Sequence, residues 1–436
     1  VAVGFESLCK NTTGTCNTSV GKGALKANIT TSENTGVGTN SLNGNTGGCN
    51  TGVGSSTLEN NTGDNNTAVG RRALYLNTSG ASNVAVGYLS LDANTTGATN
   101  VAVGRGSLGA NTTASNNVAV GDLALVANTT GANNVAIGRD SLATNTTASG
   151  NTGVGESALQ LTTTGCCNTA VGNGALQANT TGDDNVAVGQ AALAFATTAD
   201  GNTAVGRFSM FCNTTASGNI SVGAYSLFNN TEGFSNVAIG ACQPSGYGAA
   251  LELNTTGDCN VAVGNGALRS NTTADNNTAV GTLASGCNTT GTNNTSVGKQ
   301  ALQANTTGGG NTAVGANAGD AVTTGSNNTA LGFESAGKLT TGGDNVAVGR
   351  AALLDTTTQS GNVAIGVEAL ENNTADENVA VGKQTLNDNT SGTENTAVGS
   401  YALDANTTGA KNTSLGSQSL SANTTGEKNT AVGSNA

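Results

Sequence analysis

The stretch Asn117-Val118-Ala119-Val120-Gly121, followed by Leu125 and then by Asn128-Thr129-Thr130-Gly131, decides the fold of this chain. The same pattern recurs along all 436 residues. Its glycine occurs 26 times at a spacing of 17 residues, except for three gaps of 16 and one of 24 after Gly240. A short repeat that fills a chain is typical of a solenoid, in which each coil packs only against its neighbours.

We number each repeat from this glycine, which is position 0. Position −4 is Asn in all 25 repeats that contain it, −3 is almost always Thr or Val, and −1 is Val, Ile or Leu. Position −2 is only Ala, Ser or Gly, +4 is Leu in most repeats, and a second Asn stands at +7 in most. Because β-branched residues favour strands while Asn and Gly favour turns, the repeat predicts two short strands per coil joined by two turns.

The predicted fold class is all-β: a single β-solenoid (β-roll) of about 26 coils with 17 residues per coil, spanning residues 1–436. Coils stacked at about 4.8 Å would give a rod on the order of 120 Å long. The 24-residue gap holds the only proline of the chain, Pro244. Insertions in solenoids emerge as loops, so we expect an inserted loop at 241–250 and a resumed repeat at Ala250-Leu251.

Three repeats between residues 281 and 340 depart from the pattern at +4, where Ser285, Gly319 and Ala336 replace Leu. In two of them an apolar residue, Val322 or Leu339, replaces the Asn at +7. We interpret this as an apolar contact that has moved along the coil, and we expect 281–340 to be the least well-packed stretch.

The side chains at −3 and −1 share one face of the strand and −2 lies on the other, because strand side chains alternate. If −3 and −1 fill the core, −2 points outward, and its restriction to small residues indicates that another copy of the chain packs over it. The alternative is that −2 points into a very narrow core.

The invariant Asn at −4 predicts an amide ladder, in which stacked side chains bond one another and the backbone of the turns. Representative members of this Asn ladder are Asn17, Asn34, Asn83, Asn100, Asn185 and Asn345.

Composition excludes several functions. The net charge is −12 and only 10% of residues are charged, whereas a nucleic-acid partner requires clustered Lys and Arg. No apolar run is long enough for a membrane span. The chain has no His, and its acidic residues occupy no converging positions. We therefore predict that it is not an enzyme and has no catalytic residues, no cofactors and no metal site.

Nine cysteines fit no zinc or haem spacing, and together they suggest an oxidising, extracellular setting. Cys9 and Cys16 flank one turn and could pair, and Cys242 and Cys259 could tie down the inserted loop. The odd count leaves at least one thiol free or available to another chain.

The Asn-Thr-Thr turns are also acceptor sequences for N-glycans, which would form a stripe of sugar along one edge. The alternative is that a chain rich in Asn and Thr contains such sequences by composition. The candidates at +7 are Asn11, Asn28, Asn77, Asn94, Asn111, Asn128, Asn145, Asn179, Asn213, Asn254, Asn271, Asn288, Asn305, Asn389, Asn406 and Asn423, and Asn60, Asn229 and Asn372 are shifted by one residue.

The motif Asn-Thr-Ala-Val-Gly, with Ala-Leu and Asn-Thr-Thr-Gly after it, resembles two groups of repeats along the whole chain. One is the head repeat of trimeric autotransporter adhesins, a left-handed β-roll, although its usual unit is shorter than 17 residues. The other, which is more similar, is the repeat array of phage and virus tail-fibre-like proteins. Both resemblances imply a homotrimer.

We therefore expect an extracellular structural repeat protein at a cell or virion surface, a subunit of a filament or appendage whose partners are copies of itself and glycans. Because the array begins and stops without a polar capping coil, we expect end-to-end stacking. The alternative is a receptor-binding adhesin or tail-fibre shaft. An ice-binding solenoid is disfavoured because the Thr-Thr pairs lie in turns.

Overall fold

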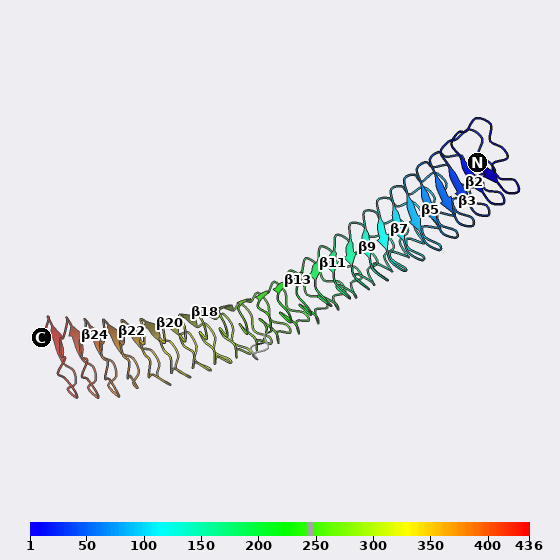
Figure 1. Cartoon of the computed structure of the whole chain (residues 1–436). Helices are drawn as coiled ribbons and strands as arrows, with labels where there is room; N and C mark the ends of the chain where they lie inside the picture. Colours follow the sequence, from blue (N-terminus) through cyan, green and yellow to red (C-terminus); the bar gives the residue numbers. More distant parts are fainter. Residues whose placement is uncertain (243–247) are drawn as a thin grey trace. The chain divides into compact units, whose positions relative to one another are not determined.

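The structure is a computed structural model that describes residues 1–242 and 248–436. The described chain is a parallel β-solenoid without helices (Figure 1). It divides into two compact units, residues 1–217 and 218–436. The prediction of a solenoid with about 17 residues per coil is confirmed. That the two units form one uninterrupted solenoid stays a prediction.

Each unit contains one parallel sheet, in which a strand pairs in the same phase with the strands of the coils before and after it. The strands of the first unit are β1 Ala2–Val3, β2 Thr18–Val20, β3 Thr35–Val37, β4 Thr51–Val53, β5 Thr67–Val69, β6 Val84–Val86, β7 Val101–Val103, β8 Val118–Val120, β9 Val135–Ile137, β10 Thr152–Val154, β11 Thr169–Val171, β12 Val186–Val188 and β13 Thr203–Val205. Those of the second unit are β14 Ile220–Val222, β15 Val237–Ile239, β16 Val261–Val263, β17 Thr278–Val280, β18 Thr295–Val297, β19 Thr312–Val314, β20 Thr329–Leu331, β21 Val346–Val348, β22 Val363–Ile365, β23 Val379–Val381, β24 Thr396–Val398, β25 Thr413–Leu415 and β26 Thr430–Val432.

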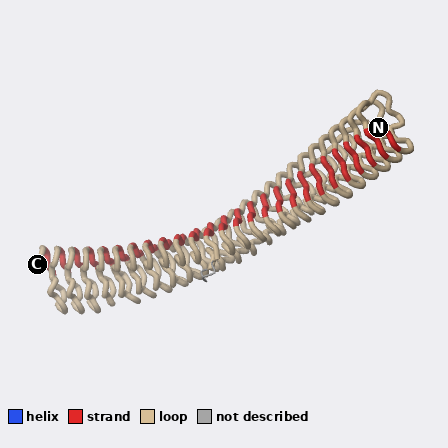
Figure 2. Tube along the Cα trace, viewed as in Figure 1, coloured by secondary structure: helices blue, strands red, loops and turns tan. Residues whose placement is uncertain are grey.

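A described coil contains one strand, at positions −3 to −1, and not the two that we predicted (Figure 2). The Ala-Leu segment forms a turn, because its residues alternate into the left-handed region. In the coil after β8, Leu123 has a φ of 57° and Leu125 of 53°. A left-handed residue costs about 1–2 kcal/mol. Full burial of the Leu125 side chain contributes about 1.5–3 kcal/mol, which offsets that cost at +4.

Hydrogen bonds between coils continue around the turns as well as along the strand. Leu125 N donates to Ser141 O at 2.9 Å, and Thr129 N donates to Thr146 O at 2.9 Å. The polar backbone is therefore paired from coil to coil on several sides, as a thin solenoid requires.

The interior of a coil is formed by positions −4, −2, +3, +4, +7 and +10. In the coil of β8 the buried residues at these positions are Asn117, Ala119, Ala124, Leu125, Asn128 and Gly131. The strand residues at −3 and −1 are instead half-buried or exposed. Our preferred interpretation of −2 as an outward position was therefore wrong, and the narrow-core alternative is the observed one. The core is thin because two Asn and three small residues share it with one Leu.

The anchor glycines at position 0 permit this close stacking. Gly121 has a φ of 141°, and a Cβ on it would lie 2.5 Å from the carbonyl oxygen of Gly138 in the next coil. Both the backbone conformation and the contact exclude a side chain, which explains why this position is Gly in each repeat.

The departures from the repeat leave the strand register unchanged. Val322 and Leu339 are buried, so the apolar contact has moved to +7 in those coils as predicted. Across the 24-residue gap, Val237 pairs with Val261, and Leu251 is buried like the Leu at +4 of other coils. Residues 243–247 of the predicted loop at 241–250 lie outside the described residues, and the poorer packing of 281–340 stays a prediction.

We predict that Gly121→Ala destabilises the first unit by about 2–5 kcal/mol, because a left-handed Ala and a steric overlap with the next backbone add together. The thermal unfolding midpoint followed by circular dichroism measures this effect.

Gly201→Ala is the matched control, since Gly201 has a φ of 64° and no atom lies within 4 Å of an added Cβ. Other coils carry side chains at this position with similar φ values, such as Asn133. Equal losses in the two variants would contradict the proposed role of the close approach.

Candidate functional site

The asparagines at −4 form a continuous ladder within each unit. The side-chain Oδ1 of Asn83 accepts the backbone N–H of Asn100 at 2.9 Å, and the Nδ2 of Asn100 donates to Ala114 O at 2.9 Å. Asn185 and Asn345 make the same two kinds of contact. Each amide thus pairs a buried backbone donor of the next coil and a turn carbonyl, which accounts for its invariance.

The asparagines at +7 form a second buried ladder, which the sequence analysis did not foresee. Asn111 Nδ2 donates to Asn94 Oδ1 at 2.9 Å and to Ala114 O at 3.1 Å. Unlike the first ladder, this one is interrupted, for example by Ala196 and Val322. A sequence signal existed, because Val and Leu replace Asn here, and such replacements are typical of a buried position.

This second ladder contradicts the predicted glycan stripe. Fourteen of the sixteen candidates at +7 are fully buried, while Asn11 and Asn423 in the outermost coils are half-buried. A sugar on Nδ2 would need space that the neighbouring coils fill, and it would break the amide contacts. The acceptors that are shifted by one residue are less buried than those at +7. Asn60 is exposed, and Asn229 and Asn372 are half-buried at the surface.

The nine cysteines are all free in the structure. The predicted pairs Cys9–Cys16 and Cys242–Cys259 are therefore not formed, because their members lie at different positions around the coil. Cys166 and Cys167 are neighbours, and hydrogen bonding to Cys167, together with burial and Asp183, raises the pKa of Cys166 to about 11. A thiol with such a pKa is protonated near neutral pH and hence a weak nucleophile.

A row of Ser and Asp residues at −6 caps the backbone on the turn before the strand. Ser149 Oγ accepts the backbone N–H of Ala132 at 3.0 Å, and Asp183 Oδ1 accepts that of Cys166 at 2.6 Å. Acidic residues in this row thus make a structural contact with the backbone of the preceding coil.

The outer face of each sheet is lined by the residues at −3 and −1. About 38% of Val171 and 40% of Ile137 is exposed, whereas the neighbouring Ala170 and Ala136 are fully buried. In all 26 repeats, −3 and −1 hold only Val, Ile, Leu or Thr. We call these two rows the outer sheet face, and it follows the strands along each unit.

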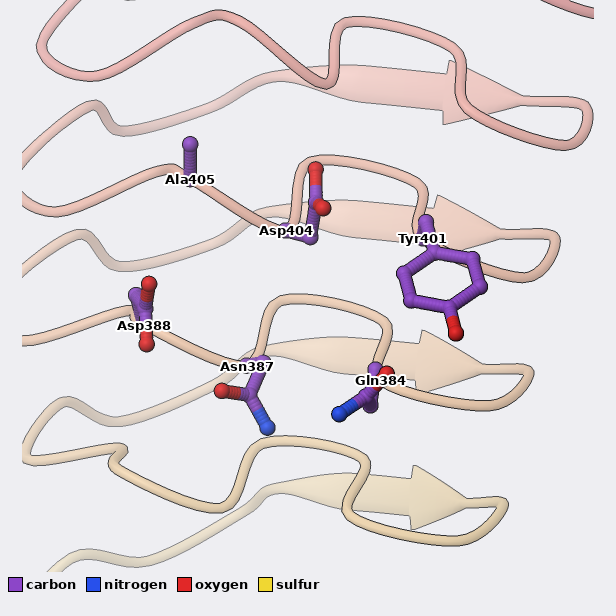
Figure 3. A pocket seen from close by; sticks show the side chains of 6 residues that line it. All are labelled: Gln384, Asn387, Asp388, Tyr401, Asp404 and Ala405. Carbon is purple, nitrogen blue, oxygen red and sulfur yellow. The ribbon is translucent and has the colours of Figure 1, made fainter.

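Shallow pockets lie between the turns on another side of the coils. One in the second unit has a volume of about 150 Å³ and is lined by Asp388, Tyr401, Asp404 and three further residues (Figure 3). Burial raises the pKa of Asp404, whose Oδ1 lacks a hydrogen-bond partner. A larger apolar groove of about 380 Å³ lies in the first unit beside Tyr88, where Gly106 and Gly109 lack side chains.

Within residues 1–242 and 248–436 no three His, Cys, Asp or Glu side chains are grouped so that they could hold a metal ion. The same residues contain no helix that is long and apolar enough to cross a membrane.

Comparison with known proteins adds no family assignment, since no protein-family model matches the chain and no curated protein is significantly similar to it.

We predict that Asn100→Ala destabilises the first unit more than Asn111→Ala does, by about 1–3 kcal/mol, because only the former leaves a buried backbone N–H unpaired. Urea unfolding of the two variants followed by circular dichroism compares them directly. A larger loss for Asn111→Ala would contradict this ranking of the two ladders.

We further predict that a chain secreted from a eukaryotic host carries no N-glycan on the fully buried +7 asparagines. Any glycan should be attached at an acceptor that is exposed or half-buried: Asn11, Asn60, Asn65, Asn229, Asn276, Asn293, Asn327, Asn372 or Asn423. Mass spectrometry of glycopeptides locates the sugars. Substitution of these nine residues by Gln serves as the control and should remove the sugar, whereas sugar retained on Asn111 would contradict the buried ladder.

Proposed function

We propose that the chain is a non-enzymatic structural repeat protein, the shaft subunit of an extracellular filament or of an appendage on a cell or virion surface. One observation carries the proposal: the invariant residues of the repeat all serve to stack one coil on the next. The Asn at −4 bonds the neighbouring backbone, Gly at 0 permits close approach, and small residues at −2 fill the core.

A catalytic or small-ligand function would be expected to show a local departure from the repeat. In the regular coils of each unit the variable positions lie at the surface, and the constrained ones lie inside or on the outer sheet face. The departures at Val322 and Leu339 are apolar and buried, and offer no catalytic group. Such a molecule gains length with each coil without gaining a new site, which suits a spacer or shaft.

The second candidate is the shaft of a homotrimeric adhesin or tail fibre that binds a receptor. The outer sheet face favours it, since an exposed apolar surface of this extent marks an association site. The resemblance to adhesin heads and tail-fibre repeats points in the same direction, and the insertion at 241–250 is the non-repetitive segment in which a receptor contact would be sought.

The structure removes two observations that supported this function from the sequence, the glycan acceptors and the disulfides. Glycans at the Asn-Thr-Thr turns no longer form part of the proposal, because those amides are buried. Extracellular localisation loses its support from disulfides, because the cysteines are free. It now depends on the repeat architecture alone.

Electron microscopy of the purified chain and of the native particle tests the proposal. We expect elongated particles of about 120 Å if both units continue as one solenoid, following the stacking distance of coils. Fibres much longer than one chain would favour the filament, and discrete bundles of three would favour the adhesin. Compact globular particles would contradict both.

A further inference from the structure

We propose that the outer sheet face is the surface on which a second copy of this chain packs, side by side and with both solenoids pointing the same way. The inference deepens the proposed structural function and rests on it. It concerns each unit separately.

The first argument is the composition of a surface that is open to water. A solvent-facing strand position accepts Lys, Glu or Gln, yet no charged residue occurs at −3 or −1 in any of the 26 repeats. The preference of strands for β-branched residues explains Val and Thr, but that preference would equally permit Tyr or Phe, which are also absent. The restriction therefore indicates a covered surface.

The second argument is area. More than a third of each side chain such as Val171 or Val188 is exposed. The thirteen strands of one unit each add two such positions to the outer sheet face, whereas a typical stable interface needs about 800 Å² per partner. Monomeric proteins usually expose apolar patches of only a few hundred Å².

The third argument identifies the occupant. The two rows repeat once per coil, and the register is unchanged from strand to strand within a unit. A partner that covers such a surface along its length must have the same axial spacing. A second copy of this chain has that spacing by construction, and a symmetric arrangement brings each coil against its equivalent.

The fourth argument is the charge at the two edges of the outer sheet face. Eight of the fifteen Lys and Arg residues stand at +1, directly after the anchor glycine, and all eight are exposed: Lys22, Arg71, Arg105, Arg139, Arg207, Lys299, Arg350 and Lys383. We call this row the basic edge, although it also contains Asp122 and Glu156, which pair with Arg105 and Arg139.

The opposite edge, at −6 and −5, is acidic. It contains twelve of the twenty-seven acidic residues: Glu33, Asp64, Asp183, Asp184, Asp200, Asp258, Asp275, Asp344, Asp376, Glu377, Glu394 and Glu427. The only cations on this acidic edge are Lys411 and Lys428, both in the second unit. Several of these aspartates also accept backbone N–H groups of the preceding coil.

These edges select the orientation of the partner. When two copies face each other around an axis parallel to the solenoid, the basic edge of one lies against the acidic edge of the other on both sides. When the copies run in opposite directions around an axis along the strands, basic meets basic and acidic meets acidic. Complementary charge favours the parallel arrangement and disfavours the antiparallel one.

The experiment measures the mass of the purified full chain against concentration by sedimentation equilibrium. We expect an oligomer that dissociates at least tenfold more readily, by about 1.4 kcal/mol or more, when Val86, Val103 and Val120 are all changed to Lys. The control carries Lys at Thr96, Thr113 and Thr130, which lie in the same coils and are exposed at +9. The control should associate like the wild type.

In a second variant Val86, Val103 and Val120 are changed to Thr. This variant keeps β-branched residues in the strands, so it tests the face even if the Lys variant unfolds. It should also weaken association while the circular dichroism spectrum stays unchanged. A wild type that is monomeric at about 100 μM, or face variants that associate like the wild type, would overturn the inference.

Reversal of the basic edge tests the orientation. Lys22→Glu, Arg71→Glu and Arg207→Glu together should raise the dissociation constant about tenfold or more in a parallel assembly, because acidic then meets acidic. The matched control reverses Lys10, Lys26 and Lys338, which lie away from both edges, and should have little effect. In an antiparallel assembly the edge variant would associate like the wild type, which would overturn the parallel arrangement.

Failure of this inference is distinguishable from failure of the proposed function. Elongated particles that sediment as monomers would leave the structural shaft intact and reject the interface. Compact particles would reject the shaft itself, whatever their mass.

Discussion

The stacking of one coil on the next through backbone hydrogen bonds is the constraint on which the rest of this structure depends. At the anchor glycine the backbones approach so closely that a Cβ on Gly121 would lie 2.5 Å from the next carbonyl oxygen. Because each coil must fit both neighbours in this way, its length and conformation are repeated almost without change. The near-constant spacing of the glycines in the sequence is a direct consequence.

Close stacking also explains why so polar a chain can fold. A coil of 17 residues surrounds too little volume for an ordinary apolar core, so its interior combines Ala and Leu with two asparagines. The amides at −4 accept backbone N–H groups of the next coil, and those at +7 bond one another and turn carbonyls. Where the +7 ladder is interrupted, the Oδ1 atoms of Asn145 and Asn305 lack a hydrogen-bond partner. Burying an amide without a hydrogen bond costs free energy. In a ladder this cost is small, because the equivalent residue of the next coil provides a hydrogen-bond partner.

The interpretation of the strand shows what periodicity leaves open. Alternation along the strand places −2 on one face and −3 and −1 on the other. It does not say which of the two faces lies inside the coil. In ordinary sheets the larger side chains fill the core, which favours −3 and −1 as the inner positions. An outward strand position that holds only a few residue types still indicates that another surface packs over it. The positions that meet this condition are −3 and −1, which hold Val and Thr at the surface, and no longer Ala119 and its equivalents.

The sequence by itself determined the solenoid, its coil length, the amide ladder at −4 and the continuation of the repeat beyond the insertion, because these follow from spacing and invariance. Only the tertiary structure decided which face is inside, that the Ala-Leu segment is a left-handed turn, and that the +7 asparagines are buried. The physical reason is that a short period is compatible with either face inward. The choice depends on how much volume the closed coil encloses, which no single repeat reveals.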